Sequence, residues 1–426
     1  MLQLAVIRQD PDFVRERLLV KNFDASAAIG SILSLDEKKR KLQQELESAQ
    51  AGLNSISKEI GQWMAKGEKG KAEEKKQEVA RIKSTLPSLQ EAMEETEKQL
   101  QQILVSLPNL PDSKVPPGKT PEDNVQVREG GVKPALPVNA LAHWDLAKKY
   151  NLIDFELGNK ITGSGFPVYV NQGARLQRAM VQYFLDYNTD AGFTEYQPPL
   201  VVNEASAFGT GQLPDKEAQM YLVNLDALYL IPTSEVPLTN LYRDVILKEK
   251  EIPVKMTAYT PCFRREAGSY GKDVRGLNRL HQFDKVEIVQ IVHPDKSGQA
   301  LDEMVSHVEK LILSLGLPYR ILRLCGGDMS FASAITYDFE VFSAAQEKWL
   351  EVSSVSNFET FQTNRMKVRF KDDQGKTRLL HSLNGSSLAL PRILACLLEN
   401  NQKEDGIHLP GVLHSYFKGE KISAST

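Results

Sequence analysis

Near the N-terminus, two stretches place apolar residues at the alternating three- and four-residue spacing of a coiled-coil seam. Residues 35–63 keep this spacing with only position 39 polar, and residues 72–103 keep it with Lys75 and Thr96 as polar members. Between them, residues 66–71 (KGEKGK) contain two glycines, which suit the end of one helix and the start of the next. The pattern predicts an antiparallel helical arm whose helices, at ~1.5 Å per residue, are on the order of 45 Å long.

The predicted arm has two further features, an internal proline and an uneven distribution of charge. Pro87 removes a backbone donor inside the second stretch, which predicts a bend or a local break there. Residues 57–84 hold eight Lys or Arg against five Asp or Glu, whereas residues 85–104 hold one Lys against four Glu. A modest excess of this kind is usually only the solvated face of a coiled coil.

The pattern changes after the arm. Residues 107–124 are rich in proline and predict an extended linker. Residues 140–156 and 172–190 predict helices, strands and helices then alternate, and Pro391 fits the first turn of a further helix. Neither G-x-G-x-x-G nor G-x-x-x-x-G-K-[ST] occurs, so nucleotide binding would need another architecture.

Residues 263–287 (FRREAGSYGKDVRGLNRLHQFDKVE) read as two extended segments around a basic, glycine-containing loop. Side chains two apart share a strand face, which pairs Arg264 with Glu266 and Phe283 with Glu287. Charges gathered on such a surface are costly when buried unless they pair or bind something. A structural salt-bridge cluster is an equally good interpretation of this hairpin alone. The predicted loop residues are Gly268, Gly271, Lys272, Arg275, Gly276 and Arg279.

Composition narrows the class of protein. The chain has 426 residues, 41% of them hydrophobic, which predicts two or more domains with a sizeable core. A net charge of −3 gives no global basic field, so nucleic-acid binding would use local patches. No signal-peptide pattern or run of roughly 20 apolar residues occurs, so we expect a soluble cytosolic protein with no membrane contact. The three widely spaced cysteines, Cys262, Cys325 and Cys396, predict no zinc site.

The 263–287 segment resembles motif 2 of the class II aminoacyl-tRNA synthetases, specifically the seryl-tRNA synthetases. Other segments resemble that family in the same order along essentially the whole chain. These are residues 192–202 with 209–214 (motif 1 region), Thr233-Ser234-Glu235 (the serine-binding triplet), and Glu351-Val352-Ser353-Ser354 with residues 383–392 (motif 3 region). The resemblance implies an α+β protein with an N-terminal tRNA-binding domain, residues 1–108, and a linker, residues 109–139. A class II catalytic domain, residues 140–426, would follow, with an antiparallel sheet flanked by helices.

The resemblance also assigns nucleotide-binding roles. Arg264 would bridge the amino-acid carboxylate and the α-phosphate, as suits a planar, always-charged fork. Glu266 would accept from the adenine amino group, and Arg279 and Arg392 would hold the triphosphate. Phe283 would stack on adenine, although an aromatic residue in a strand is often ordinary core. The implied ATP-binding set is Arg264, Arg265, Glu266, Arg279, Leu280, Phe283, Glu351, Val352, Ser353, Ser354 and Arg392, with Arg264 and Arg392 as catalytic residues.

Serine and metal contacts are implied in the same way. The implied serine-binding set is Thr233, Ser234, Glu235, Arg264, Glu287 and Ser386. Glu351 and Ser354 would hold Mg²⁺, a hard cation that takes oxygen ligands. Because residues three apart face opposite sides of an ideal strand, we expect a bend or bulge at Val352-Ser353.

The implied activity is ATP-dependent formation of seryl-adenylate from L-serine, followed by transfer of serine to the 3′ end of serine tRNA. Selenocysteine tRNA stays open as a second substrate. The family is homodimeric, with motif 1 in the interface and the arm holding the tRNA. Two alternatives are a paralogue that charges a carrier protein, which would be expected to lack the arm, and an inactive scaffold. The presence of Arg264, Glu266, Arg279, Glu351 and Arg392 argues against an inactive scaffold.

Overall fold

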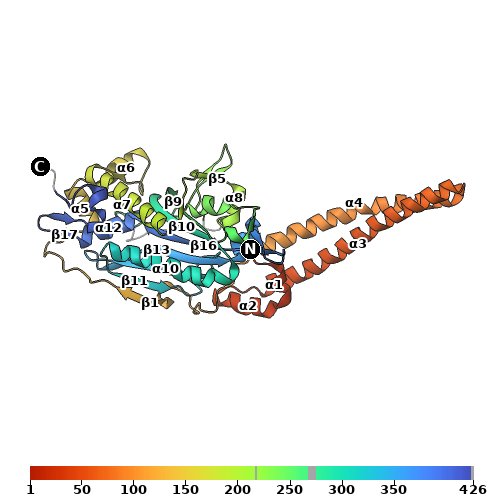
Figure 1. Ribbon diagram of the computed structural model, residues 1–426, viewed down its shortest axis with the longest axis horizontal. Coiled ribbons are helices and arrows are strands. Elements are labelled where there is room, and N and C mark those ends of the chain that lie inside the picture. Colours follow the sequence, from red (N-terminus) through yellow and green to blue (C-terminus); the bar gives the residue numbers. More distant parts are fainter. Residues whose placement is uncertain (216–217, 267–274, 424–426) are drawn as a thin grey trace. The chain divides into compact units, whose positions relative to one another are not determined.

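The computed structural model describes residues 1–215, 218–266 and 275–423 (Figure 1). Its internal contacts divide the chain into two compact units. One comprises Leu2–Leu19 and Phe23–Pro108, and the other comprises Met1, Val20–Asn22 and Asn109–Thr426. The predicted limits of the catalytic domain and its linker stay a prediction, and we note that strand β1 (Val125–Gly130) lies within the segment expected to be linker.

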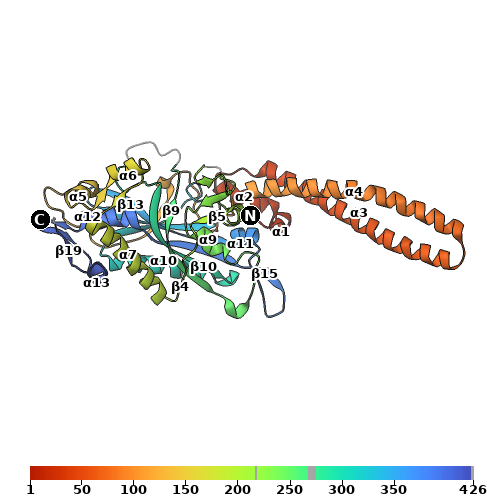
Figure 2. The same ribbon diagram turned by 90° about the horizontal axis from the view of Figure 1, so that it is seen from above.

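The helical unit consists of α1 (Leu4–Gln9), α2 (Pro11–Val20), α3 (Ser26–Ala65) and α4 (Lys69–Ser106). Helices α3 and α4 lie side by side in both ribbon views, which confirms the predicted hairpin (Figures 1 and 2). Helix α4 continues through Pro87, so the predicted local break is wrong, and a bend at Pro87 stays a prediction. The seam explains this result, because Leu86 and Leu89 are half-buried on either side of the proline.

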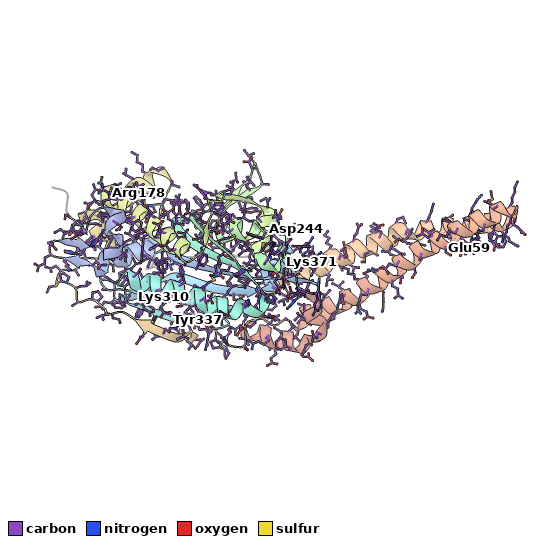
Figure 3. All side chains as sticks on the ribbon, in the orientation of Figure 1. Glu59, Arg178, Asp244, Lys310, Tyr337 and Lys371 are labelled. Atoms are coloured by element: carbon purple, nitrogen blue, oxygen red, sulfur yellow. The ribbon has the colours of Figure 1, made fainter. Side chains whose placement is uncertain are left out.

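Charged side chains pair between elements of this unit at three levels. At the base, the buried Asp36 accepts two hydrogen bonds of 2.7 Å from the Arg8 guanidinium. Further out, Lys39 of α3 pairs with Glu97 of α4 at 2.8 Å. Glu59, labelled in Figure 3, lies 3.5 Å from Lys75 near the turn. These pairs fix which part of the arm can be removed without disturbing its base.

The second unit is built on an eight-stranded sheet with the order β1-β11-β12-β13-β16-β10-β9-β4. All neighbours are antiparallel except β4 and β9, which are parallel, so the predicted antiparallel sheet is confirmed. Besides β1, the sheet contains β4 (Thr194–Glu195), β9 (Val254–Phe263), β10 (Gln282–Val292), β11 (Tyr319–Arg323), β12 (Ile335–Ser343), β13 (Lys348–Glu359) and β16 (His381–Ala389).

Three amphipathic helices cover this sheet: α7 (Asn171–Asp190), α10 (Ser297–Ser314) and α12 (Leu390–Asn400). Their apolar faces meet the sheet in one core that includes the buried Phe184, Val308 and Leu394. Helix α7 confirms the prediction for residues 172–190, and α12 has Pro391 in its first turn as predicted.

Residues 140–156 do not form the single helix predicted for them. The chain forms α5 (His143–Lys149), a two-residue strand β2 (Ile153–Asp154) and α6 (Phe155–Ile161). Asn151 has a φ of +49°, a left-handed conformation that ends the first helix. Asp154 then caps the second helix by accepting from the Leu157 amide at 2.8 Å. Apolar spacing alone cannot predict either of these two interruptions, which is why a single helix was expected.

The remaining elements form small sheets and short helices around the main sheet. They are β3 (Val168–Tyr169), β5 (Val201–Asn203), α8 (Glu204–Thr210), β6 (Leu222–Val223), β7 (Leu228–Leu230), α9 (Glu235–Asn240), β8 (Ile246–Lys248), α11 (Thr360–Met366), β14 (Arg369–Lys371), β15 (Thr377–Leu379), β17 (Gln402–Lys403), β18 (Gly406–His408), α13 (His414–Phe417) and β19 (Lys421–Ile422). Across the described ranges, no helix combines the length and the apolar character needed to cross a bilayer.

Candidate active site

The predicted motif 2 hairpin is formed by β9 and β10, which pair from Phe263 with Gln282 inward. Arg264 and Glu266 were expected to lie in the first strand, but β9 ends at Phe263 and both residues follow it. Glu266 has a φ of +49°, which is incompatible with a continuing strand. The predicted loop residues Gly268, Gly271 and Lys272 lie outside the described residues.

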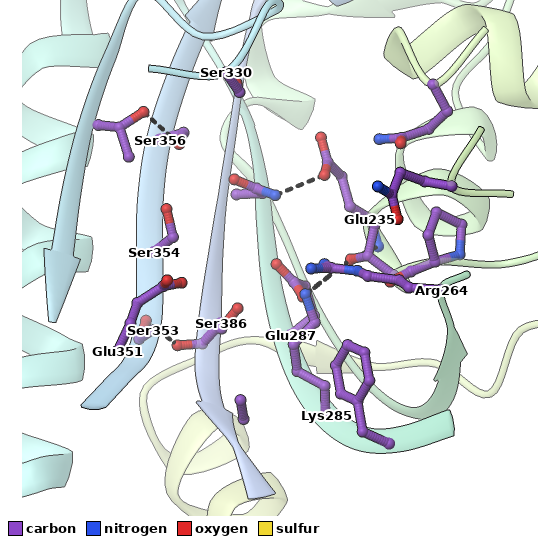
Figure 4. A pocket seen from close by; sticks show the side chains of 18 of the residues that line it. Glu235, Arg264, Lys285, Glu287, Ser330, Glu351, Ser353, Ser354, Ser356 and Ser386 are labelled. Carbon is purple, nitrogen blue, oxygen red and sulfur yellow. Dashed lines mark hydrogen bonds and ion pairs between the residues drawn. The ribbon is translucent and has the colours of Figure 1, made fainter. Parts of the chain in front are cut away.

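Three adjacent strands bring residues from distant parts of the sequence together. On β10, Glu287 faces Ser386 of β16, and β16 in turn neighbours β13. The Ser353 hydroxyl of β13 donates to the Ser386 carbonyl at 2.6 Å (Figure 4). Sheet register therefore joins motif 2 to both halves of the motif 3 region.

These strands form one side of a cavity of about 690 Å³. Most of the predicted site residues line it, and they come from five separate segments. They are Thr233, Glu235, Arg264, Glu266, Arg279, Leu280, Phe283, Glu287, Glu351, Val352, Ser353, Ser354, Ser386 and Arg392.

Two predicted residues do not line the cavity. Arg265 turns away, donating from Nε to the Met220 carbonyl at 3.0 Å and lying 5.0 Å from the centre of the Tyr221 ring. Ser234 is fully buried, and no described residue hydrogen-bonds its hydroxyl. Direct contact of either side chain with a ligand in this cavity would need a rearrangement.

Of the polar residues that line the cavity, Glu287 is the most buried, with almost no exposed surface. Its Oε2 accepts from the Thr233 hydroxyl at 3.1 Å and pairs with the Lys285 ammonium, which also donates to Thr233 at 3.1 Å. Among the described residues, none hydrogen-bonds the other oxygen, Oε1. A buried carboxylate oxygen without a partner is costly. This oxygen is therefore suited to accept from a ligand (Figure 4).

Glu235 supplies a second buried carboxylate, and its surroundings differ. Its two oxygens accept from the Gln362 and Asn384 amides at 2.6 and 2.7 Å. Burial, reinforced by the nearby Glu287 carboxylate, raises the pKa of Glu235 to about 7. A ligand ammonium placed beside it would favour the ionised form.

Lys285 was not predicted from the sequence, although it lies between Phe283 and Glu287 on the same face of β10. We expect Lys285→Met to lower the free energy of unfolding by about 3 kcal/mol or more, because it leaves the Glu287 carboxylate buried without its cation. Urea denaturation with an unchanged m-value measures this. The exposed Lys371 on β14 (Figure 3) gives a matched control, Lys371→Met, which should stay within about 0.5 kcal/mol. A loss below about 1 kcal/mol for Lys285→Met would contradict the role of the pair.

The other part of the cavity carries the predicted nucleotide contacts. Arg264 donates from Nε to the Pro232 carbonyl at 3.3 Å, and its guanidinium lies 5.2 Å from the centre of the Phe283 ring. Phe283 is partly buried, packs against the main core and also lines the cavity, so its stacking on adenine stays a prediction. Glu266 and Arg279 form an ion pair of 3.0 Å.

Arg392 completes this part of the cavity from the first turn of α12. Its terminal nitrogen donates to the Glu351 carbonyl at 2.7 Å and lies 3.5 Å from the Glu351 carboxylate. Its Nε donates to the Asn278 carbonyl at 3.2 Å. One arginine thus joins the end of the motif 2 loop to β13.

The oxygen groups predicted to hold a cation lie where β13 is irregular. Opposite β12, Phe339 pairs with Ser353 and Glu340 pairs with Glu351, so Val352 is an extra residue. This β-bulge lets Glu351 and Ser354 line the same cavity, as expected. Asp338, which the sequence did not indicate, also lines the cavity, and its Oδ1 has no hydrogen-bond partner among the described residues.

These groups fit a magnesium ion that keeps ligands of its own. Carboxylate and hydroxyl oxygens are what a hard divalent cation prefers. The described residues contain no group of three or more His, Cys, Asp or Glu side chains able to form a protein-only metal site. Mg²⁺ at Glu351 and Ser354 would therefore draw its other ligands from phosphate oxygens and water, as this ion commonly does.

Several residues in or next to the cavity were not predicted, mostly because their positions depend on tertiary pairing. Asn384 and Gln362 reach Glu235 from β16 and α11, more than 100 residues along the chain. Asp338 lies opposite Ser354 only through the pairing of β12 with β13. Lys285 is the one such residue that the sequence could have indicated, because strand alternation puts it on the same face as Phe283 and Glu287, which were already assigned to the site.

Comparison with known proteins agrees with this geometry. Residues 1–111 match the seryl-tRNA synthetase N-terminal domain, and residues 221–401 match the tRNA synthetase class II core domain (G, H, P, S and T). The serine–tRNA ligase of Salinibacter ruber is 48% identical over 426 residues, 100% of each chain.

Solved structures are similar over the same length. A seryl-tRNA synthetase from Pyrococcus horikoshii complexed with ATP has a TM-score of 0.94 at 32% identity and covers 100% of both chains. The cytoplasmic serine–tRNA ligase of Naegleria fowleri in complex with AMP has a TM-score of 0.89 at 25% identity, covering 100% of this chain and 99% of that one. The chain therefore belongs to the serine–tRNA ligase, or seryl-tRNA synthetase, family, and its larger unit is a class II tRNA synthetase core.

Proposed function

We propose that this protein activates L-serine with ATP and transfers it to the 3′ end of serine tRNA. The observation that carries the proposal is the buried Glu287 Oε1, to which no described residue donates a hydrogen bond, in a cavity that Glu235 and Arg264 also line. Two carboxylates and a guanidinium match an amino acid with a hydroxyl, an ammonium and a carboxylate. The whole-chain similarity to serine–tRNA ligases supports the same substrate.

The activation step needs no protein nucleophile. The serine carboxylate attacks the α-phosphorus of ATP, the bond to the bridging oxygen breaks, and pyrophosphate leaves with that electron pair. Arg264 would hold the attacking carboxylate and the α-phosphate together, and Arg279 and Arg392 would bind the leaving phosphates. Positioning and neutralisation of charge then account for catalysis. Mg²⁺ at Glu351 and Ser354 would supply further neutralisation of the phosphates when bound.

The second step uses the adenylate as an acyl donor. A ribose hydroxyl at the tRNA 3′ end attacks the serine carbonyl, the mixed anhydride breaks, and AMP leaves. Arg264 would remain beside the α-phosphate, where it stabilises the negative charge of departing AMP. The other site contacts would keep the serine side chain fixed through both steps.

Serine-dependent exchange of pyrophosphate into ATP tests the first step, and aminoacylation of serine tRNA tests the second. We expect exchange without tRNA and charging only with it. Charging of a carrier protein in place of tRNA would favour the paralogue alternative, and no exchange with any amino acid would favour the inactive scaffold. The same charging assay with selenocysteine tRNA decides whether that tRNA is a second substrate.

We further propose that the α3–α4 arm binds the tRNA, that the active form is a homodimer and that it acts in the cytoplasm. The basic excess at residues 57–84 supports contact with phosphates, which position a nucleic acid without reading its sequence. The short, exposed edge strand β4 belongs to the motif 1 region and supports an interface there. Sedimentation velocity tests the oligomeric state.

Replacing residues 43–93 with a short glycine–serine turn should separate the two reactions. This deletion leaves the Arg8–Asp36 and Lys39–Glu97 pairs intact. We expect pyrophosphate exchange within about threefold of wild type, whereas kcat/KM for tRNA falls by about tenfold or more through lost phosphate contacts. The exchange rate of the same preparation is the control for folding. An unchanged KM for tRNA would show that the arm does not bind it.

A further inference from the structure

Outside the cavity, a buried polar cluster connects α5, α12 and the end of the motif 2 loop. His143, the first residue of α5, is fully buried, and both of its ring nitrogens have partners. Its Nδ1 lies 2.7 Å from Glu399 Oε1 on α12, and its Nε2 accepts from the Leu277 amide at 2.9 Å. One imidazole thus links a helix to the backbone of a cavity segment.

The partners determine the form of this imidazole. A backbone amide can only donate, so Nε2 must carry a lone pair and Nδ1 must carry the proton that Glu399 accepts. Burial acts to raise the pKa of Glu399, but hydrogen bonds from the His143 ring, the Ser343 hydroxyl and the His143 amide hold it below its ordinary value. His143 is therefore a neutral link between a carboxylate and an amide.

The loop passes so close to this ring that only glycine fits beside it. Gly276 has a φ of +69°, and a Cβ there would lie 2.2 Å from His143 Nε2. Next to it, the Arg275 guanidinium lies 4.5 Å from the centre of the Trp144 ring. Consecutive residues of α5 thus contact consecutive residues of the loop.

The residues after this contact belong to the cavity. Leu277, Asn278, Arg279 and Leu280 all line it. The Asn278 carbonyl accepts from Arg392, while its side-chain amide donates to Gln346 at 3.2 Å. Because Arg392 and Glu399 are both on α12, that helix holds the segment directly at Asn278 and through His143 at Leu277.

We propose that His143 is a positioning residue for ATP, which fixes Leu277–Arg279 against α12 so that Arg279 and Arg392 keep their spacing. Of the described residues that line the cavity, His143 is not one, and it would act through the Leu277 amide. This inference rests on the proposed function, because it assumes that Arg279 and Arg392 bind the triphosphate.

Two near-isosteric substitutions separate the two ends of the link. Asparagine can replace Nδ1 as a donor to Glu399 but does not reach Leu277, whereas glutamine places a carbonyl oxygen near the Nε2 position. We expect His143→Asn to raise the KM for ATP in pyrophosphate exchange by about tenfold and to leave the KM for serine within about twofold. His143→Gln should stay within about threefold for both substrates.

Hydrogen–deuterium exchange of peptides covering residues 276–283, without nucleotide, gives a readout that does not depend on activity. The Leu277 amide should be protected in wild type and His143→Gln and should exchange faster in His143→Asn. Gly276→Ala provides a second route if His143→Asn does not fold, since it displaces the same segment and should raise the KM for ATP alone. Gly375→Ala is its matched control, with a φ of +75° and nothing within 4 Å of the added Cβ.

An ATP KM within about twofold of wild type in His143→Asn, or an equal rise of both KM values, would overturn the proposal. Equal losses in the asparagine and glutamine variants would overturn it as well, because they would indicate a general role in folding. Wild-type protein without serine-dependent exchange would instead contradict the proposed function, and the protection of Leu277 would still report on the link.

Discussion

Replacing Arg264 with alanine is expected to lower kcat/KM for ATP in serine-dependent pyrophosphate exchange by about 10²-fold or more. The Pro232 carbonyl and the Phe283 ring fix this side chain at the wall of the cavity. From there it would contact two anionic groups whose mutual repulsion rises as they approach bonding distance. Loss of the guanidinium removes a contact that strengthens in the transition state.

Arg264→Lys should recover little of this activity, because an ammonium cannot make a forked contact to two anions. Arg369→Ala, a change of the same type on the outlying strand β14, should leave the exchange rate within about twofold of wild type. A near-normal rate for Arg264→Ala would mean that this arginine serves the fold and not the reaction.

Replacing Glu287 with alanine is expected to reduce the preference for serine over alanine by about 10²-fold or more. In wild type, bound alanine would leave Glu287 Oε1 buried with no donor among the described residues, a penalty that can reach roughly 10⁴-fold in discrimination. Removing the carboxylate removes that penalty. Threonine keeps the hydroxyl, so its exclusion must come from shape.

The measurement is the ratio of kcat/KM for serine and alanine in pyrophosphate exchange by the same enzyme. The ratio is independent of the fraction of active protein, which matters because Glu287→Ala also leaves Lys285 buried without its partner. Glu404→Gln, in an exposed turn, is the control for the loss of a carboxylate elsewhere. An unchanged ratio in Glu287→Ala would show that Glu287 binds the ammonium or stabilises the fold and does not read the hydroxyl.

Periodicity predicted the elements whose partners are near in sequence. The heptads predicted α3 and α4 because each helix buries its seam against the other across a short turn. The β9–β10 hairpin was predicted for the same reason, because its two strands are joined by a single loop. The single helix predicted for residues 140–156 was wrong. Asn151 ends one helix by its left-handed backbone conformation and Asp154 caps the next, and neither effect can be predicted from apolar spacing.

In the candidate site, too, some features could be predicted from the sequence, whereas others depend on pairing between distant segments. Resemblance located Glu287 and Ser386, but their direct opposition depends on β10 and β16 pairing across almost 100 residues. The bulge at Val352 could be expected from the need to place Glu351 and Ser354 together, because that argument used strand geometry. The link through His143 could not be expected, since His143, Leu277 and Glu399 each lie more than 100 residues from the next and each alone looks like an ordinary core or surface residue.

The pairing of Lys285 with Glu287 also sets the charge balance of the amino-acid end of the cavity. With Arg264 and an ionised Glu235 included, as a ligand ammonium would favour, two formal positive charges face two negative ones. A neutral zwitterion enters such an environment without disturbing its balance. Aspartate or lysine would bring one further charge into a buried site that holds no counter-charge for it, at a cost of several kcal/mol. The amino-acid end of the cavity would thus reject amino acids that carry a net charge, whatever the size of their side chains.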